Sequence, residues 1–84
     1  MNARPAHART KNRDEFRDVI VQTARRLYLT NGISQTSMAD LGKALGVSKP
    51  TVYEVFPSKQ MLIDAVFKSA VDDVDYGWIL RAAD

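Results

Sequence analysis

Apolar side chains recur along most of the chain at the three- and four-residue spacing of helices. Between residues 16 and 28 the series consists of Phe16, Val19, Ile20, Thr23, Ala24, Leu27 and Tyr28. This spacing is one face of a helix. Asp14 and Glu15 suit the first turn, where carboxylates complement the helix dipole. Gly32 suits the end, because glycine accepts the left-handed conformation of a C-cap.

A second and shorter helix is predicted from three apolar positions, Met38, Leu41 and Leu45. Their spacing places them on one helical face. Either Thr36 or Ser37 can cap its N-terminus, and Gly46 is expected to end it.

A third helix is predicted over residues 49–56. Ser48 is its expected N-cap, and Pro50 is tolerated in the first turn because its missing N–H would have no helical partner there. Val52 and Phe56 are one turn apart and face inward. Pro57 disfavours helical geometry at the residue before it and so ends the helix.

A longer fourth helix is predicted after Ser58, its expected N-cap. Its apolar positions are Leu62, Ile63, Val66, Phe67, Ala70, Val71 and Val74. No segment alternates with the two-residue period of a strand. We therefore predict an all-α fold, in which a three-helix, helix-turn-helix bundle (homeodomain-like) precedes a longer fourth helix.

The tight turn between the second and third helices is the most informative feature. Gly46 permits a positive φ at its centre, Val47 fills the space between the helices, and Gly42 lies where the helices are expected to cross most closely. In a helix-turn-helix the second of two such helices enters the DNA major groove. Any corner between two helices has a similar pattern, so the spacing alone leaves both interpretations open.

The outward face of residues 49–56 strengthens the DNA interpretation. Pro50 and Glu54 point most directly away from the core, with Lys49 in the first turn. Thr51 offers a hydroxyl and a methyl to base edges, and the Tyr53 phenol suits a phosphate oxygen.

Several other polar side chains suit the DNA backbone. Thr36 and Ser48 precede helices whose free N–H groups attract phosphate, and Lys59 can reach the same backbone. A structural role is the alternative for several of these residues. Thr36, Ser48 and Ser58 could serve as helix caps and nothing more, and Tyr53 could simply pack over the corner between the helices.

Charge is distributed unevenly along the 84 residues, although the net charge is only +2. Residues 1–59 hold ten basic against five acidic side chains, and residues 60–84 hold two against five. Residues 1–12, which lack apolar periodicity, are predicted to form a flexible basic arm. The basic groups near this end are Arg4, Arg9, Lys11 and Arg13. This asymmetry favours a polyanionic partner on one side of the molecule.

Composition excludes several other functions. Apolar residues make up 45% of the chain, which is an ordinary fraction for a globular domain. The chain has no cysteine and only one histidine, His7, so we expect no metal site, no cofactor and no enzymatic activity. No apolar run approaches a membrane helix and no secretory signal is visible, so we expect a cytoplasmic protein.

The end of the chain carries apolar side chains that so small a domain cannot easily cover, namely Tyr76, Trp78, Ile79 and Leu80. They suggest a surface for a partner chain or for more of the same protein. An alternative function is therefore a helical protein–protein interaction module that uses this segment.

Four segments together resemble the N-terminal DNA-binding domain of TetR/AcrR-type transcriptional regulators. They are residues 24–28 (ARRLY, followed by Asn31 and Gly32), 36–41 (TSMADL), 46–53 (GVSKPTVY) and 56–62 (FPSKQML). The resemblance covers roughly residues 14–68. It implies a DNA-binding domain over residues 13–68, a linking helix that ends in residues 69–84, and then a larger domain for an effector and for dimerisation.

The resemblance also implies contacts and partners. Phosphate contacts would come from Thr36 or Ser37, Ser48, Tyr53 and Lys59, and base contacts from Lys49, Pro50 and Thr51. The implied partner is double-stranded DNA with a palindromic operator for a homodimer, and most members are repressors.

The chain departs from the family at three points. It has Val55 where a backbone-contacting His or Tyr is common, so that contact is expected to be missing. The acidic Glu54 either accepts from a cytosine amino group or weakens non-specific binding. The sequence ends at Asp84, where the effector domain would begin, so no small-molecule pocket of ~300 Å³ is expected.

Overall fold

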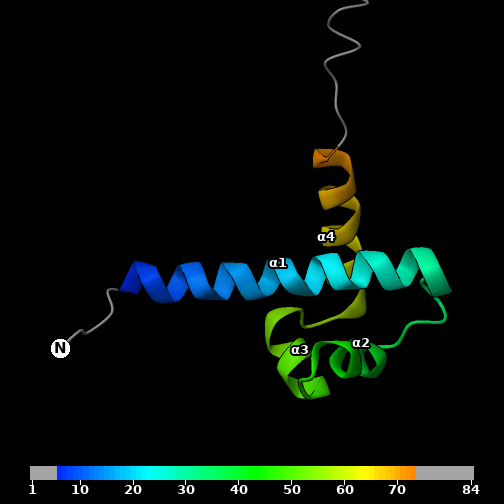
Figure 1. Ribbon diagram of the computed structural model, residues 1–84, viewed down its shortest axis with the longest axis horizontal. Coiled ribbons are helices and arrows are strands. Elements are labelled where there is room, and N and C mark those ends of the chain that lie inside the picture. Colours follow the sequence, from blue (N-terminus) through cyan, green and yellow to red (C-terminus); the bar gives the residue numbers. More distant parts are fainter. Residues whose placement is uncertain (1–5, 74–84) are drawn as a thin grey trace, which may run out of the picture.

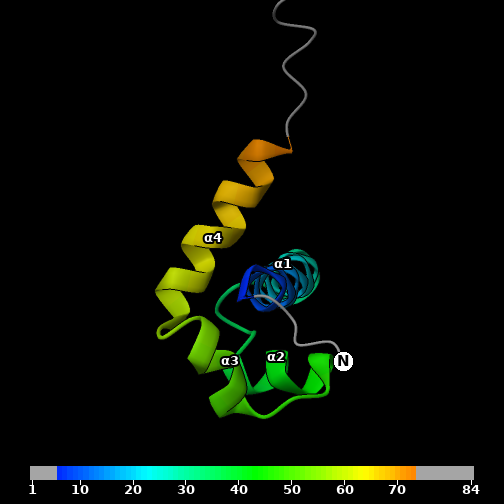
Figure 2. The ribbon, with the colours of Figure 1, turned by 90° about the vertical axis from the view of Figure 1, so that its left-hand side faces the viewer.

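The computed structural model describes residues 6–73, with side chains from Asn12 onward. These residues form four α-helices and no strand: α1 (Ala6–Asn31), α2 (Met38–Leu45), α3 (Lys49–Val55) and α4 (Lys59–Asp72). The short helices α2 and α3 lie on one side of α1, while α4 crosses α1 and extends away on the other (Figures 1 and 2). The predicted all-α class is confirmed. None of the described helices combines the length and apolarity needed to cross a bilayer.

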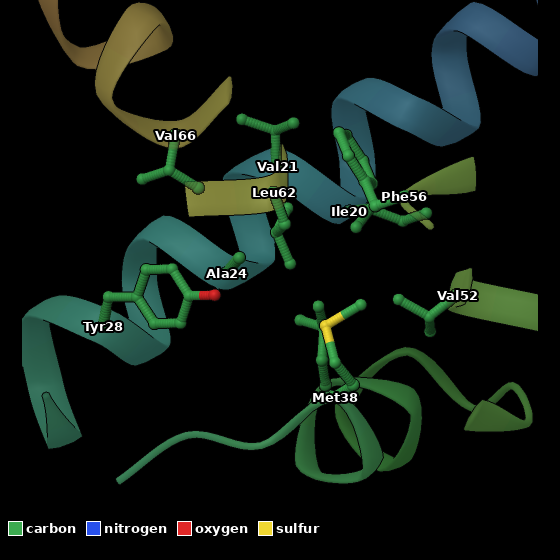
Figure 3. Close-up of a cluster of buried hydrophobic side chains, with 10 residues drawn as sticks. Ile20, Val21, Ala24, Tyr28, Met38, Val52, Phe56, Leu62 and Val66 are labelled. Carbon is green, nitrogen blue, oxygen red and sulfur yellow. The ribbon is translucent and has the colours of Figure 1, made fainter. Parts of the chain in front are cut away.

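Side chains from all parts of this bundle meet in one apolar core (Figure 3). Its buried members are Ile20, Val21, Ala24, Tyr28, Met38, Leu41, Val52, Phe56, Leu62 and Val66. Nine of these ten occupy positions that the apolar spacing assigned to inward faces. The tenth, Val21, is buried because α4 crosses α1 on that flank, which the pattern of α1 alone does not reveal (Figure 3).

Three apolar side chains expected on buried faces are about half exposed instead. They are Val19, Phe67 and Val71. The spacing of α4 predicts an apolar face that is wider than the surface α1 can cover. α4 crosses α1 at an angle and diverges from it (Figure 2). Its buried residues are Leu62 and Val66, and Phe67 and Val71 further along the helix are exposed.

The helix boundaries follow the predicted capping residues. Ser37, Ser48 and Ser58 are the N-caps of α2, α3 and α4, and each side-chain oxygen accepts a backbone N–H of the first turn. Gly32 and Gly46 have φ angles of 95° and 74°, the left-handed region that glycine adopts without steric cost. Local chemistry therefore sets three helix starts and two helix ends as predicted.

The start of α1 differs from the prediction, because residues 6–12 continue the helix rather than forming an arm. Apolar periodicity detects only helices that face a core, and this extension projects beyond α2 and α3 (Figure 1). Its alanine, arginine and lysine residues are strong helix formers. The helix begins directly after Pro5, where the missing N–H of proline breaks no helical hydrogen bond. Asp14 and Glu15 consequently lie in its interior.

The backbone of α2 closely approaches the turn that follows it. A Cβ atom built on Gly42 would lie 2.8 Å from the Val47 carbonyl oxygen and 3.4 Å from the Lys49 nitrogen. The Val47 N–H donates to the Gly42 carbonyl at 2.9 Å. Gly42 therefore sets the separation between α2 and the start of α3, as its place in the sequence predicts.

We expect Gly42→Val to destabilise the fold by about 1–3 kcal/mol, because the added atoms would displace backbone rather than a movable side chain. Thermal unfolding measures the loss, and Gly42→Ala should lose less since alanine regains up to ~1 kcal/mol of helix propensity. Ala44→Val places the same side chain at an exposed position of α2 and serves as the matched control. Equal melting temperatures for the two valine variants would contradict the close approach.

Candidate nucleic-acid interface

The outward face of α3 carries the polar side chains that the sequence assigned to DNA bases. Lys49, Pro50 and Glu54 are exposed, and Thr51 is half-buried. On the inner side Val52 is fully buried, and it anchors the helix to the core. The helix is therefore held by one face while the other is available to a ligand.

Tyr53 lies on the flank of this face and belongs partly to the core. Its ring packs against the buried cluster and is half-exposed. The Lys49 ammonium lies 5.9 Å from the ring centroid, within the range of a cation–π contact. Tyr53 therefore packs against the core and also exposes part of its side chain beside a cation. Lys49 and Tyr53 lie on the same side of α3.

The serines at the helix starts act as caps in this structure. The Ser48 hydroxyl accepts the Thr51 N–H at 3.3 Å and lies 2.8 Å from the Thr51 hydroxyl. The Ser37 hydroxyl accepts the Asp40 N–H at 2.9 Å, and the Asp40 carboxylate accepts the Ser37 N–H at 2.9 Å, which is a capping box. In this structure the hydrogen bonds of both serines are those of helix caps. Both serines are also exposed, and a phosphate contact by either one stays a prediction.

The capping box also perturbs a carboxylate. The hydrogen bond from the Ser37 backbone, followed by that from the Ser37 side chain, holds the pKa of Asp40 below its ordinary value. Lys43 and Lys59 act in the same direction through their positive charge. The ionised form of Asp40 is therefore the one that stabilises the start of α2.

We expect the stability advantage of the wild type over Asp40→Asn to depend on pH. Because the pKa of Asp40 is lower in the folded chain than its unfolded value of about 3.9, its contribution is present at neutral pH and is lost as the pH falls through the folded-state pKa. Urea unfolding at pH 7 and at successively lower pH should show the free energies of unfolding of the two proteins converging below about pH 4. A difference that stays constant with pH would contradict this role of the carboxylate.

Thr36 is buried and already hydrogen-bonded in this structure, so a phosphate contact by its hydroxyl stays a prediction. Its side chain is only 2% exposed, and its hydroxyl donates to the Gly32 carbonyl at 2.9 Å. The sequence offered Thr36 and Ser37 as equivalent caps, but only Ser37 has the extended N-cap conformation. Thr36 instead closes the turn that follows α1.

Lys59 has a structural partner that the sequence does not suggest. Its ammonium donates to the Ile33 carbonyl at 2.8 Å and is partly buried. This hydrogen bond ties the first turn of α4 to the loop between α1 and α2. A phosphate contact by Lys59 stays a prediction. To make it, the ammonium would either donate to a phosphate as well as to the Ile33 carbonyl, or give up its bond to that carbonyl.

Two residues of α3 depart from the family pattern, and their surroundings differ. Val55 is half-buried and packs against the core, so it adds no polar group to the outward face. Glu54 is exposed and has no ion-pair partner among the described residues. The carboxylate of Glu54 therefore places an uncompensated negative charge on the face that the sequence assigns to DNA.

Polar contacts between α1 and α4 were missed by sequence reasoning. Arg25 forms an ion pair with Asp73 at the end of α4. Gln22 donates to the Ser69 hydroxyl at 2.9 Å. Because the partners are separated by nearly fifty positions, no local pattern could have paired them.

The structure also contains an open cleft larger than the pocket limit set from the sequence. It has a volume of about 410 Å³ and lies between α1 and α4. Charged side chains such as Arg17, Asp18 and Lys68 line it, and they are exposed to solvent. Small-molecule sites are mostly apolar and enclosed, so this cleft lacks their character. The described residues contain no group of side chains able to hold a metal ion.

Some predicted site residues cannot be placed in this interface. Arg4 and the apolar segment 76–80 lie outside the described residues. Arg9 and Lys11 lie in the helical extension at the start of α1. Arg13 follows in the same helix, and its side chain is exposed. The basic groups near the N-terminus are thus carried, from residue 6 onward, by a helix.

Two short helices joined by a glycine turn, with the second capped, anchored and outward-facing, define a helix-turn-helix protein. The family model described as "Bacterial regulatory proteins, tetR family" matches residues 20–66, which is more than half of the chain. The chain belongs to the tetR family of bacterial regulatory proteins, as the four sequence segments implied.

Individual relatives agree with this assignment. The chain is 34% identical over 65 residues to the HTH-type transcriptional regulator EthR of Mycolicibacterium smegmatis, covering 77% of this chain and 30% of that protein. It is 38% identical over 56 residues to the HTH-type transcriptional repressor ComR of Escherichia coli, covering 67% and 27%. It is 34% identical over 65 residues to the HTH-type transcriptional activator FasR of Mycolicibacterium smegmatis, covering 77% and 30%.

The chain therefore spans about a third or less of the length of these relatives. No solved structure matches it significantly.

Proposed function

We propose that the chain binds double-stranded DNA sequence-specifically, with α3 in the major groove, as the DNA-binding module of a transcriptional regulator. The observation that carries this proposal is the exposed face of α3, which Val52 and the close approach at Gly42 hold outward from the bundle. A helix of this diameter fits the major groove, and its first residues then lie nearest the base edges.

The side chains of this face have separable roles in the proposal. Lys49, Pro50 and Thr51, at the start of α3, face the bases. Tyr53 donates its phenolic hydrogen to a phosphate oxygen, beside the positive charge of Lys49. Glu54 repels phosphate and so lowers affinity for DNA in which α3 is not correctly seated, because a carboxylate near the backbone is favourable only where a base amino group compensates it.

A single copy of this module binds one half-site, so we propose that the active species is a homodimer on a palindromic operator. Two linked modules bind more tightly through their effective concentration, and two-fold symmetry in the protein is matched by two-fold symmetry in the DNA. We further propose that the outcome is repression. Occupying a promoter excludes other proteins without requiring any additional contact from so small a domain.

We expect Tyr53→Phe to weaken binding to every duplex by roughly tenfold, for the loss of a hydrogen bond to a charged group. Lys49→Met should weaken binding mainly to the preferred duplex, because it removes a base contact. Tyr53→Phe should leave the slope of log affinity against log salt concentration unchanged, since it removes no charge. Fluorescence anisotropy with labelled duplexes selected from a random pool, at several salt concentrations, measures both quantities.

Lys68→Met is the matched control, because Lys68 is exposed and pairs with Asp72 near the end of α4. This helix runs away from α3 (Figure 2). It should retain the affinity and the salt dependence of the wild type. Absence of binding to any duplex at low salt, even when two copies are joined by a linker, would refute the proposed function.

We also propose that the helical extension of α1 strengthens binding by lying along the DNA backbone. An α-helix is about 10 Å across with its side chains, and the minor groove is only about 6 Å wide, so a helical segment cannot enter that groove as a disordered arm can. Arg9, Lys11 and Arg13 would then act through their charge and not through base contacts.

Replacing Arg9, Lys11 and Arg13 together with glutamine should reduce the salt slope by up to about 2.7. Affinity should fall by the same factor for preferred and unrelated duplexes, because phosphates carry no sequence information. Circular dichroism should show unchanged helix content, as glutamine is a good helix former. A loss confined to the preferred duplex would contradict a backbone role.

A further inference from the structure

Thr51 differs from the other residues of the α3 face in that its hydroxyl is already engaged. The Thr51 Oγ1 atom lies 2.8 Å from the Ser48 hydroxyl, and the same Ser48 oxygen accepts the Thr51 N–H at 3.3 Å. The hydroxyl is thus part of the cap that starts α3. Because a threonine Cβ carries only a hydroxyl and a methyl, the methyl is the group of this side chain that is not committed to the cap.

An exposed apolar group lies directly beside this methyl in the sequence. Pro50 is exposed at the start of α3, and its ring has no hydrogen-bond donor. The neighbouring outward positions carry the charged Lys49 and Glu54. We treat the Pro50 ring and the Thr51 methyl, which are adjacent in the sequence, as one small apolar patch between a cation and an anion on the face proposed to meet the bases.

Only one feature of the major groove matches such a patch. Guanine, cytosine and adenine present hydrogen-bond donors and acceptors there, whereas thymine adds a C5-methyl group. A free threonine hydroxyl can bond to either kind of base edge and discriminates weakly, but here the hydroxyl is bound to Ser48.

We propose that the Thr51 methyl, together with the Pro50 ring, binds the C5-methyl of a thymine in each half-site, making Thr51 a specificity-determining residue. This inference rests on the proposed function. It deepens that function by naming the chemical group recognised. It also assigns separate tasks to the two branches of one side chain, since the hydroxyl positions the helix start and the methyl contacts the base.

Deoxyuridine, which differs from thymidine only by the missing C5-methyl, tests the contact. After a preferred duplex is selected from a random pool, each thymine is replaced singly by deoxyuridine and the affinity is measured by anisotropy. For the wild-type chain we expect one position per half-site at which the replacement weakens binding about threefold to fourfold, the effect of leaving one methyl unburied. The other thymines should tolerate the change.

Thr51→Ser provides the matched variant, because it keeps the hydroxyl that pairs with Ser48 and removes only the methyl. It should bind the thymine duplex as weakly as the wild type binds the deoxyuridine duplex, and it should not distinguish the two. Thr51→Val keeps a methyl and should retain the distinction. Thermal unfolding of both variants checks that α3 is intact, and the wild-type comparison of thymine with deoxyuridine decides the matter without any variant.

The outcomes separate this inference from the function on which it rests. Selective binding with no position sensitive to deoxyuridine would overturn the methyl contact and leave the proposed function standing. The same holds if Thr51→Ser keeps the full sensitivity of the wild type. Failure to bind any duplex at low salt would overturn both.

Discussion

The arrangement of this domain depends on one close approach between backbones, where Gly42 of α2 meets the carbonyl of Val47. α3 has only seven residues, and isolated helices of that length are not stable in water. Its position is therefore imposed by α2 and the turn rather than by its own sequence. Val52 and Phe56 then fix its rotation by entering the core, and the outward direction of Lys49 and Glu54 follows from that rotation.

The serine hydroxyls at the helix starts fix the structure through local hydrogen bonds. Ser37, Ser48 and Ser58 each satisfy a backbone N–H that would otherwise lack a partner. Around Ser48 the same hydrogen bonds also orient Thr51. The chemistry that begins the third helix thus decides which atoms of that helix remain for a ligand, and structural and functional roles are not alternatives at this point of the chain.

Features governed by neighbouring residues could be predicted from the sequence. The left-handed turn at Gly46, the cap at Ser48 and the end of α3 shortly before Pro57 each follow from the conformational limits of one residue type. The resemblance of the local segments to the tetR family is likewise confirmed, by the family match over residues 20–66.

Features that depend on distant partners could not be predicted. The ion pair of Arg25 with Asp73 and the bond from Lys59 to the Ile33 carbonyl join segments whose proximity exists only in the folded chain. Burial of Thr36 likewise results from how the loop after α1 folds back. The helical extension of α1 was missed for a different reason, because a helix without a buried face leaves no apolar pattern.

That extension has a consequence for the shape of the DNA that the domain can accept. α1 has 26 residues and is thus about 39 Å long. Such a rod holds its basic end at a set distance and angle from α3, whereas a disordered arm could follow a duplex of any local bend. In the proposed complex, a duplex that contacts both parts at once would therefore follow the path that this rigid helix sets, whatever its sequence.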